Sequence, residues 1–464
     1  MRRFELILMF TAAFAVLWPV VFGVRPRRGI VAGVLLAAVL VHLQVEGFRW
    51  QMIPLYATAL GLAIGDVIFI DRKLAWTNRV ARGLFGLAGL ALAAALPFIL
   101  PVPELPSPAG PEAIGTVTVH LVDVGREEVY GPDPGGPRRF RAHVWYPAQP
   151  TAGMKPEPWV SDWEVVVPAL ARSMGLPGWF LDHTRYTSSH SVQSLPVAPG
   201  TFPVVIYSHR WTGFGSVAIN QIEALVSNGY VVIAPDHTYG AVATVDHQGE
   251  VIPYDPAALP DRQEVGDQAY FEAAERLVET FAADIVTVLD GLEEGEEGPF
   301  AAISGVADLT RVGVVGHSAG GGAAVNVCLT DERCDAVLGL DPWVEPFSVR
   351  TLRIGATRPA LFMRSDGWRG TANDSLLRGI AGRSEAVTYW LGIEGAEHND
   401  FTVAPFFSPF ADQLGLKGPI PTGRLLPILV NYLVGFFDVY LVGTGTAPLD
   451  AVSFEEVSVE VISP

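Results

Sequence analysis

One serine, Ser318, lies in a sequence that could make it a nucleophile. The apolar residues 312–315 run directly into Gly316-His-Ser-Ala-Gly320, and small residues in a helical pattern follow. A G-x-S-x-G sequence between a strand and a helix is typical of the nucleophile elbow of serine hydrolases. Glycines at 316 and 320 fit such a turn, because strand and helix must approach each other closely there. The same pattern also occurs in ordinary Gly-rich connections, so the prediction depends on the rest of the chain.

A nucleophilic serine needs a base within hydrogen-bond reach, and the base needs an acid that orients it. In hydrolases with this elbow, the order along the chain is Ser, acid, His. His398 is the only histidine that follows Ser318, and it lies just after the mostly apolar run 387–393. A loop beyond the end of a strand is where the base of such a site belongs. We therefore predict that His398 is the general base.

Two aspartates are candidates for the acid. Asp341 directly follows the apolar run 336–340, and Asp366 follows the next run, 359–364. Both would lie at the C-terminal end of a strand, so both could reach the histidine. The spacing alone does not decide whether Asp341 or Asp366 is the acid. The aspartate that is not the acid would be an ordinary turn residue.

An oxyanion hole needs two backbone N–H groups that point to the oxygen on which charge develops. We expect one from Ala319, which follows the nucleophile at the start of a helix. The other should come from the loop after the strand 203–208, in His209-Arg-Trp-Thr-Gly213. Trp211 is the first choice for this donor and Arg210 the second. His209 is expected to be structural, because the base is already assigned.

The charge distribution divides the chain of 464 residues into two unlike parts. Residues 1–100 hold ten Lys/Arg and four Asp/Glu, whereas the remainder holds 21 and 45, and the whole chain carries a net charge of −18. An acidic body of this kind repels nucleic acid, so we predict no nucleic-acid partner. The two cysteines, Cys328 and Cys334, are too few for a disulfide scaffold and could be either paired or free.

Four apolar runs follow one another near the N-terminus, at residues 4–24, 29–45, 52–70 and 83–100. Each has roughly the 20 residues that cross a bilayer, although two are slightly short. We predict an all-α, four-helix transmembrane region at 1–100 in the plasma membrane, with the lipid bilayer as its partner. The connections 25–28 and 71–82 are strongly basic, so the positive-inside rule puts them in the cytoplasm and the region after residue 100 outside.

The rest of the chain consists of a Pro-rich linker at 101–111 and a domain at 112–464 in which strands alternate with helices. This alternation predicts an α/β fold with a doubly wound, mostly parallel sheet. We find no zinc-type ligand spacing and no phosphate loop, so we predict neither a metal nor a cofactor. Segments 148–200 and 238–265 are expected to be insertions over the active site. The expected strands are 115–123, 139–146, 203–208, 230–234, 311–316, 335–340, 359–364 and 387–393, the first two forming a hairpin, and the expected helices are 216–228, 267–290, 318–329, 371–380 and 423–441.

Four stretches of this domain resemble a known family. They are Phe202-Pro-Val-Val-Ile-Tyr-Ser-His209, Gly229-Tyr-Val-Val-Ile-Ala-Pro-Asp-His237, Asp308-Leu-Thr-Arg-Val-Gly-Val-Val-Gly-His-Ser-Ala-Gly-Gly321, and Leu338-Gly-Leu-Asp-Pro-Trp343 with Glu397-His-Asn-Asp-Phe401 downstream. Over roughly residues 112–442 the chain looks like the platelet-activating-factor acetylhydrolase family of α/β-hydrolases, which also resembles cutinase-like polyester hydrolases. The resemblance implies an acid from the earlier strand and so favours Asp341 over Asp366. A His-Gly-x-Gly-like loop forms the oxyanion hole in that family, and Arg210 replaces the glycine here.

Together, these features predict a membrane-anchored serine esterase or lipase with Ser318, Asp341 and His398 as its catalytic triad. The family resemblance implies an α/β-hydrolase fold and a substrate with a small acyl ester, which could be part of a phospholipid. A cutinase-like or general carboxylesterase is the alternative among enzymes. A non-catalytic membrane receptor or scaffold that retained a hydrolase fold is the alternative from another class.

Overall fold

The computed structural model describes residues 1–24, 26–27, 29–68, 76–132, 134–151, 153–444 and 453–462, and the chain divides into two compact units. Unit 1 comprises Met1–Pro103 together with Asp182–Tyr186 and Phe407–Phe410. Unit 2 comprises Glu104–Leu181, Thr187–Phe406 and Ala411–Pro464. No pattern in the sequence predicts that the two short segments would belong to unit 1.

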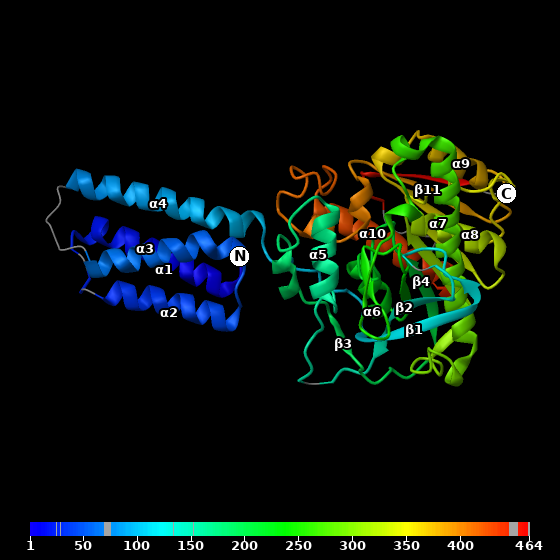
Figure 1. Ribbon diagram of the computed structural model, residues 1–464, viewed down its shortest axis with the longest axis horizontal. Helices are drawn as coiled ribbons and strands as arrows, with labels where there is room; N and C mark the ends of the chain where they lie inside the picture. Colours follow the sequence, from blue (N-terminus) through cyan, green and yellow to red (C-terminus); the bar gives the residue numbers. More distant parts are fainter. Residues whose placement is uncertain are drawn as a thin grey trace. The chain divides into compact units, whose positions relative to one another are not determined.

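The main part of unit 1 consists of long apolar helices, labelled in Figure 1. They are α1 (Arg3–Phe22), α2 (Ile30–Val45), α3 (Ile53–Ile68) and α4 (Trp76–Ile99), with the short 3₁₀ helix η1 (Trp50–Met52) before α3. Helix α4 begins at Trp76 instead of residue 83, because polar residues such as Asn78 extend a helix that hydropathy alone does not detect. Large apolar side chains also face outward, with Phe10 exposed by 63% and Phe85 by 81%. Helices that are apolar on all sides require apolar surroundings.

Part of the charge bias that predicts the orientation lies outside the described residues. The basic residues outside the described ranges are Arg25, Arg28, Arg72 and Lys73. Residues 69–70, which end the third predicted apolar run, also lie outside these ranges.

A buried ion pair connects the helices of unit 1. Arg49 donates through Nε and Nη2 to the two carboxylate oxygens of Glu5, at 2.7 Å each, and neither side chain is exposed. Arg49 also donates to the backbone carbonyls of Pro97 and Leu100, at 3.3 and 2.6 Å. A charge buried without a partner is costly, so Arg49 depends on Glu5, while Glu5 also pairs with Arg2 at 2.9 Å. Glu5 and Arg49 thus tie α1, the α2–α3 connection and the end of α4 together.

Unit 2 is built on a ten-stranded sheet with the order β12-β11-β10-β9-β8-β4-β5-β2-β1-β3. The six strands from β11 to β5 in this order are parallel, while β12 pairs antiparallel with β11, and β2 pairs antiparallel with both β5 and β1. The strands are β1 (Ala113–Glu127), β2 (Pro137–Ala148), β3 (Ser191–Gln193), β4 (Phe202–Ser208), β5 (Val231–Asp236), β8 (Ala307–His317), β9 (Ala336–Leu340), β10 (Ala360–Arg364), β11 (Thr388–Ile393) and β12 (Val457–Ile462).

The neighbours β4 and β8 mark the topological switch point of the sheet. The chain continues from β4 to β5 on one side and returns to β8 on the other. The loops that leave the C-terminal ends of two such strands diverge, and ligands of open α/β sheets bind in the crevice between them. Ser318 directly follows β8, and His209 directly follows β4.

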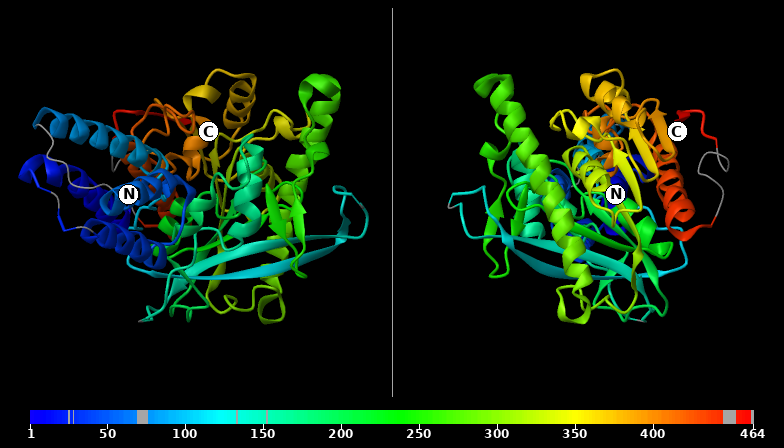
Figure 2. Two further views of the ribbon diagram at one scale, coloured as in Figure 1. Left: turned by 60° about the vertical axis from the view of Figure 1, so that its left-hand side comes forward. Right: turned by 90° about the vertical axis from the view of Figure 1, so that its right-hand side faces the viewer.

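Helices cover both faces of the sheet. In the right-hand view of Figure 2, the long green α7 (Arg262–Glu293) and the red α10 (Thr422–Phe437) lie on opposite sides of the strands. Helix α10 and the residues up to Val442 are long and apolar enough to cross a membrane. Packing within unit 2 accounts for this apolar character, because a Cβ on Gly313 of β8 would lie 2.4 Å from the ring of Phe437. The remaining helices are α5 (Trp163–Ser173), α6 (Ile219–Ser227), α8 (Ala319–Thr330) and α9 (Ala372–Ala381).

The strands and helices predicted for this unit are present, including the hairpin of β1 and β2. The elements not predicted are α5, β3, β12 and the small antiparallel pair β6 (Ala243–Val245) and β7 (Val251–Pro253). Strands of three residues are too short to show an alternating pattern, and Pro168 inside α5 conceals that helix. Cys328 and Cys334, which the sequence left open, form a disulfide.

Candidate active site

Ser318 lies on a strained turn between β8 and α8. Its backbone has φ 59° and ψ −120°, a conformation that residues with a side chain rarely adopt outside functional sites. A Cβ on Gly316 would lie 2.1 Å from the carbonyl oxygen of Gly320, so strand and helix can meet here only without that side chain. The backbone N–H of Ser318 donates to the carbonyl of Leu340 at 3.0 Å and fixes the turn to β9.

His398 contacts Asp341, which directly follows β9. The two residues are hydrogen-bonded through His398 Nδ1 and Asp341 Oδ2 at 2.9 Å. The buried carboxylate of Asp341 also accepts from the backbone N–H and the hydroxyl of Ser365, at 2.8 and 2.6 Å. Because a carboxylate can only accept, Nδ1 carries the proton, and Nε2 keeps a free lone pair when the ring is neutral.

Aromatic rings hold the imidazole of His398 on two sides. Trp368 stacks on it with ring centroids 4.9 Å apart and an interplanar angle of 10°. The ring of His317, the residue before the serine, lies 4.4 Å from it between centroids. His398 is 28% exposed and Ser318 is half-buried, so both can be reached from solvent. The Ser318 hydroxyl has no hydrogen-bond partner in the described part of the chain, as is common for a nucleophile before substrate binds.

Asp366, the second candidate for the acid, contacts a different group. Its Oδ2 accepts from the backbone N–H of Gly395 at 2.6 Å, and its Oδ1 pairs with Arg369. Asp366 therefore joins the loop after β10 to the turn that precedes His398. Of the two aspartates, only Asp341 is hydrogen-bonded to the imidazole.

The loop after β4 lies against the start of α8. A Cβ on Gly320 would lie 2.3 Å from the carbonyl oxygen of Ser208, which ends β4. The two predicted oxyanion donors, the backbone N–H groups of Ala319 and Trp211, have no acceptor among the residues with described coordinates. Neither N–H group is therefore occupied by a hydrogen bond within the described residues.

Arg210 connects this loop to the histidine. Its Nη1 donates to Oδ1 of Asn399, which follows His398 on the 3₁₀ helix η7 (His398–Phe401), at 2.6 Å. Burial lowers the pKa of the Arg210 guanidinium from its usual value.

A second Ser-His-Asp set, which the sequence analysis did not predict, is buried in the same unit. His237 Nε2 is hydrogen-bonded to Ser208 Oγ at 2.9 Å, and its Nδ1 to Asp284 Oδ2 at 3.0 Å. All three residues are inaccessible to solvent. The ring of His237 stacks on Phe281 with centroids 3.8 Å apart. A substrate cannot reach this serine, so the second chain is a structural brace.

The brace is charge-balanced and supports the loop after β4. Arg138 donates to both carboxylate oxygens of Asp284, at 3.1 and 2.7 Å. Burial raises the pKa of Asp284, but Arg138 and His237 outweigh it and hold that pKa far below its usual range. The backbone N–H of His237 donates to Nε2 of His209 at 3.1 Å, and Nδ1 of His209 bonds to the carbonyl of Arg210 at 2.7 Å. Burial lowers the pKa of His209 to about 3, so this ring stays neutral, in keeping with a structural role.

One feature of the sequence could have revealed Asp284. The helix predicted at 267–290 has an apolar face that includes Phe281, Ile285 and Val288, and Asp284 lies on the same face. A single carboxylate within an apolar face requires a buried partner. No local feature of the sequence identifies that partner, which is Arg138 on β2.

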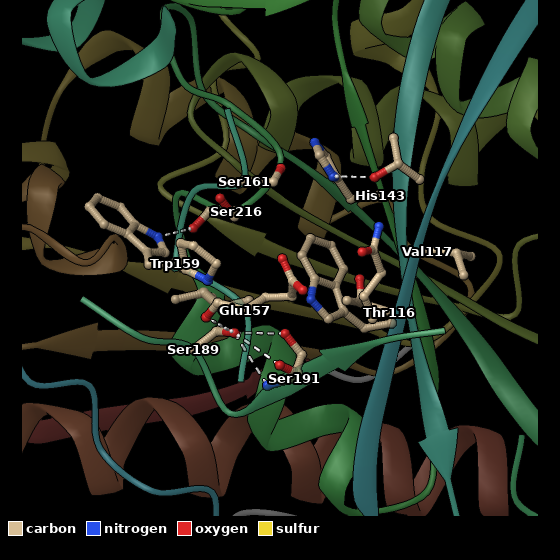
Figure 3. Close-up of a pocket in the computed structure, with 14 residues that line it drawn as sticks. Thr116, Val117, His143, Glu157, Trp159, Ser161, Ser189, Ser191 and Ser216 are labelled. Carbon is tan, nitrogen blue, oxygen red and sulfur yellow. Dashed lines mark hydrogen bonds between the residues drawn. The ribbon is translucent and has the colours of Figure 1, made fainter. Parts of the chain in front are cut away.

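The cavity drawn in Figure 3 is separate from these residues. It encloses about 50 Å³ and is lined by polar side chains such as Thr116, Glu157, Ser189 and Ser191, together with His143. This volume accommodates only a few water molecules. None of the predicted site residues lines it, so it is not the substrate pocket.

Removal of the charge on Asp284 tests the brace. We expect Asp284→Asn to lower the free energy of unfolding by roughly 3 kcal/mol or more, because Arg138 loses a buried counter-charge. The exposed Asp267 on the same helix pairs with Arg262, so Asp267→Asn is a matched control that should have little effect. Urea unfolding followed by tryptophan fluorescence measures both variants, and equal losses would contradict a buried, charge-balanced brace.

Comparisons with known proteins agree on one family. The family model for platelet-activating factor acetylhydrolase, isoform II, matches residues 137–441. A platelet-activating factor acetylhydrolase from Cavia porcellus is 22% identical over 257 residues, which cover 52% of this chain and 58% of that protein. One from Gallus gallus is 25% identical over 138 residues, 29% of this chain and 32% of that protein. The chain therefore spans about half or less of the length of these curated relatives.

A solved structure matches over a longer part of the chain. A ferulic acid esterase from Streptomyces cinnamoneus aligns with a TM-score of 0.62 and 27% identity, covering 77% of this chain and 99% of that one. With the parallel sheet and the elbow, this similarity confirms the predicted α/β-hydrolase fold. Because the family model covers more than half of the residues, the chain belongs to the family of platelet-activating factor acetylhydrolase, isoform II.

Proposed function

We propose that the protein is a membrane-anchored serine esterase that hydrolyses carboxylic esters. The observation that carries this proposal is the hydrogen bond between His398 and Asp341 beside a serine on a strained elbow. A strained, partly exposed serine next to an oriented imidazole is the arrangement that acyl transfer needs. Family membership and the similarity to an esterase structure support the same reaction class.

In the proposed mechanism, Ser318 Oγ attacks the carbonyl carbon of the ester while His398 Nε2 takes its proton. Asp341 keeps the proton of His398 on Nδ1 and stabilises the imidazolium that forms. The imidazolium then protonates the leaving alcohol, and an acyl-enzyme remains. Water, activated by His398, releases the acid and restores Ser318. The reaction needs neither a metal nor a cofactor.

In this mechanism the backbone N–H groups of Ala319 and Trp211 hold the developing oxyanion. The backbone N–H of Arg210 is the second choice in place of that of Trp211. Each such donor is typically worth a few kcal/mol of the activation barrier. Support comes from the free N–H groups and from the brace of His237 and Asp284, which fixes the loop after β4.

For the substrate, we propose an ester with a small acyl group, carried by a phospholipid. The support is the membership in the acetylhydrolase family. The second candidate is a cutinase-like or general carboxylesterase, which the likeness to a ferulic acid esterase over 99% of that chain favours. Hydrolysis of a hydroxycinnamoyl ester or a polyester, with none of an acetylated phospholipid, would select the second candidate.

Replacement of the nucleophile separates the two Ser-His-Asp chains. We expect Ser318→Ala to lower kcat on a short-chain p-nitrophenyl ester by about four or more orders of magnitude and to abolish labelling by a fluorophosphonate probe. Ser208→Ala, a matched control in the buried chain, should still be labelled. Full activity of Ser318→Ala would refute the mechanism, and a folded protein that never reacts with the probe would favour a non-catalytic receptor or scaffold.

The two aspartates can be distinguished by isosteric substitution. We expect Asp341→Asn to reduce kcat roughly a thousandfold or more, because an amide cannot hold the imidazole in the same way. Asp366→Asn should have a much smaller effect, since the Asp366 carboxylate bonds the backbone N–H of Gly395 and Arg369 instead of the imidazole. Steady-state kinetics on one ester compares them, and a larger loss for Asp366→Asn would reverse the assignment.

We also propose that α1 to α4 anchor the protein in the plasma membrane, with unit 2 on the extracytoplasmic side. Three of these helices, extended by η1 in the case of α3, are long and apolar enough to cross a bilayer, and α2 is shorter. The basic connections predict the orientation. The disulfide between Cys328 and Cys334 fits an oxidising compartment outside the cytoplasm.

Cysteine labelling in intact cells tests the orientation. The described chain has no free cysteine, so single cysteines can be introduced without background. We expect a membrane-impermeant maleimide to label Gln248→Cys, in an exposed turn of unit 2, but not Thr77→Cys, which is exposed in the first turn of α4 within the basic segment 71–82. The reverse pattern would place unit 2 in the cytoplasm, and recovery of the protein in a soluble fraction would refute the anchor.

A further inference from the structure

Arg210 is a cation next to the proposed nucleophile and base. It lies between His209 and Trp211 in the loop after β4, and its Nη1 donates to Asn399, the neighbour of His398, at 2.6 Å. Its charge also lowers the pKa of His317, in addition to the larger effects of burial and of His398. The ring of His317, the residue before Ser318, lies 4.4 Å from that of His398 between centroids, so Arg210 and His317 both contact the segment of His398 and Asn399.

Arg210 differs from the other enclosed arginines of unit 2 in its partner. Within the ranges that the structure describes, it forms no ion pair with a carboxylate, and its bonded neighbour Asn399 is neutral. An enclosed guanidinium without a counter-charge loses hydration without compensation. The other buried arginines of the unit each contact a carboxylate at 2.7 Å; the pairs are Arg138–Asp284, Arg141–Asp236 and Arg364–Asp374.

The guanidinium keeps the capacity to bind an anion. Arginine has five N–H donors in a planar fork that fits a carboxylate or a phosphate. One hydrogen bond to Asn399 leaves most of these donors unused. Although its guanidinium is largely enclosed, Arg210 as a whole residue remains partly exposed. Since the chain as a whole is acidic, attraction of an anion to this site must come from a local cation.

We infer that Arg210 binds an anionic group of the substrate, so that the ester cleaved at Ser318 carries a carboxylate or a phosphate close to the scissile bond. This inference rests on the proposed function, because it takes Ser318 as the nucleophile. It goes beyond the proposed function by assigning the recognition of the substrate's anionic group to one residue, Arg210. The anion has two possible sources, a free carboxylate on the acyl group or a phosphodiester on the alcohol.

The test compares matched charged and neutral esters with the full-length protein in detergent. In the carboxylate arm, mono-p-nitrophenyl succinate is compared with p-nitrophenyl butyrate. In the phosphate arm, an acetylated glycerophosphocholine ether is compared with the same acetylated glycerol ether without the headgroup. The readout in each arm is the preference ratio, which is kcat/KM for the charged ester divided by kcat/KM for the neutral one.

The variants separate the charge of Arg210 from its hydrogen bond. Arg210→Gln removes the charge but keeps an N–H that can donate to Asn399, and Arg210→Lys keeps the charge. Asn399→Ala keeps the charge and removes the hydrogen bond. Arg358→Met is the matched surface control, because Arg358 lies before β10, at the opposite strand end from Asp366.

We expect Arg210→Gln to lower the preference ratio by roughly tenfold to a hundredfold in at least one arm, as for the loss of a charge-assisted hydrogen bond. Arg210→Lys should retain part of the preference, and Asn399→Ala and Arg358→Met should retain it fully. The arm that responds identifies the source of the anion. An unchanged ratio in both arms would overturn the inference, as would equal losses for charged and neutral esters.

The experiment distinguishes a failure of the inference about Arg210 from a failure of the proposed esterase function. Hydrolysis of the neutral esters and its dependence on Ser318 test the esterase directly. If Ser318→Ala abolishes hydrolysis of the neutral esters but the preference ratio is the same with and without Arg210, the inference about Arg210 is wrong and the proposed esterase function is retained. Thermal unfolding of each variant establishes that it is folded, and if Arg210→Gln is not, Arg210→Met supplies the uncharged side chain for the same comparison.

Discussion

The site depends on a contact between two stretches of backbone. A side chain on Gly320 would lie 2.3 Å from the carbonyl oxygen of Ser208 and 2.4 Å from that of His209, so only glycine lets α8 and the loop after β4 meet. This contact joins the two loops that leave the adjacent parallel strands β4 and β8. Without it, the strained serine and the loop that carries Trp211 would not lie together at the C-terminal ends of β4 and β8.

The two Ser-His-Asp sets of unit 2 differ in solvent access and in the serine: Ser208 is hydrogen-bonded to His237, whereas the Ser318 hydroxyl has no partner among the described residues. The distances between imidazole and carboxylate are 2.9 Å in one chain and 3.0 Å in the other. The chain of Ser208 is closed on all sides and balanced by Arg138, so it stiffens the loop that carries Arg210. The chain of His398 stays partly open to solvent, which a reacting group requires. The same three residue types thus serve rigidity in one position and suit chemistry in the other.

The sequence reveals those parts of the site that depend on neighbours along the chain. The elbow of Ser318 and the loop position of His398 are local, and so are the long amphipathic and apolar segments of both units. The choice between Asp341 and Asp366 is not local, and the family resemblance rather than the spacing favoured Asp341. Contacts between distant segments leave no pattern in the local sequence. Arg210 and Asn399, for example, are 189 positions apart, and His237 and Asp284 are 47 positions apart. Short edge strands such as β3 were missed because three residues carry no periodicity.

The buried pair of Glu5 and Arg49 has a consequence for how this chain can vary. The pair is sealed inside unit 1, and the arginine also satisfies carbonyl groups at the end of α4. Loss of Glu5 leaves Arg49 without its buried counter-charge, whereas loss of Arg49 leaves Glu5 still paired with Arg2 at 2.9 Å. Substitution of Glu5 should therefore be tolerated among related chains only together with a change at position 49.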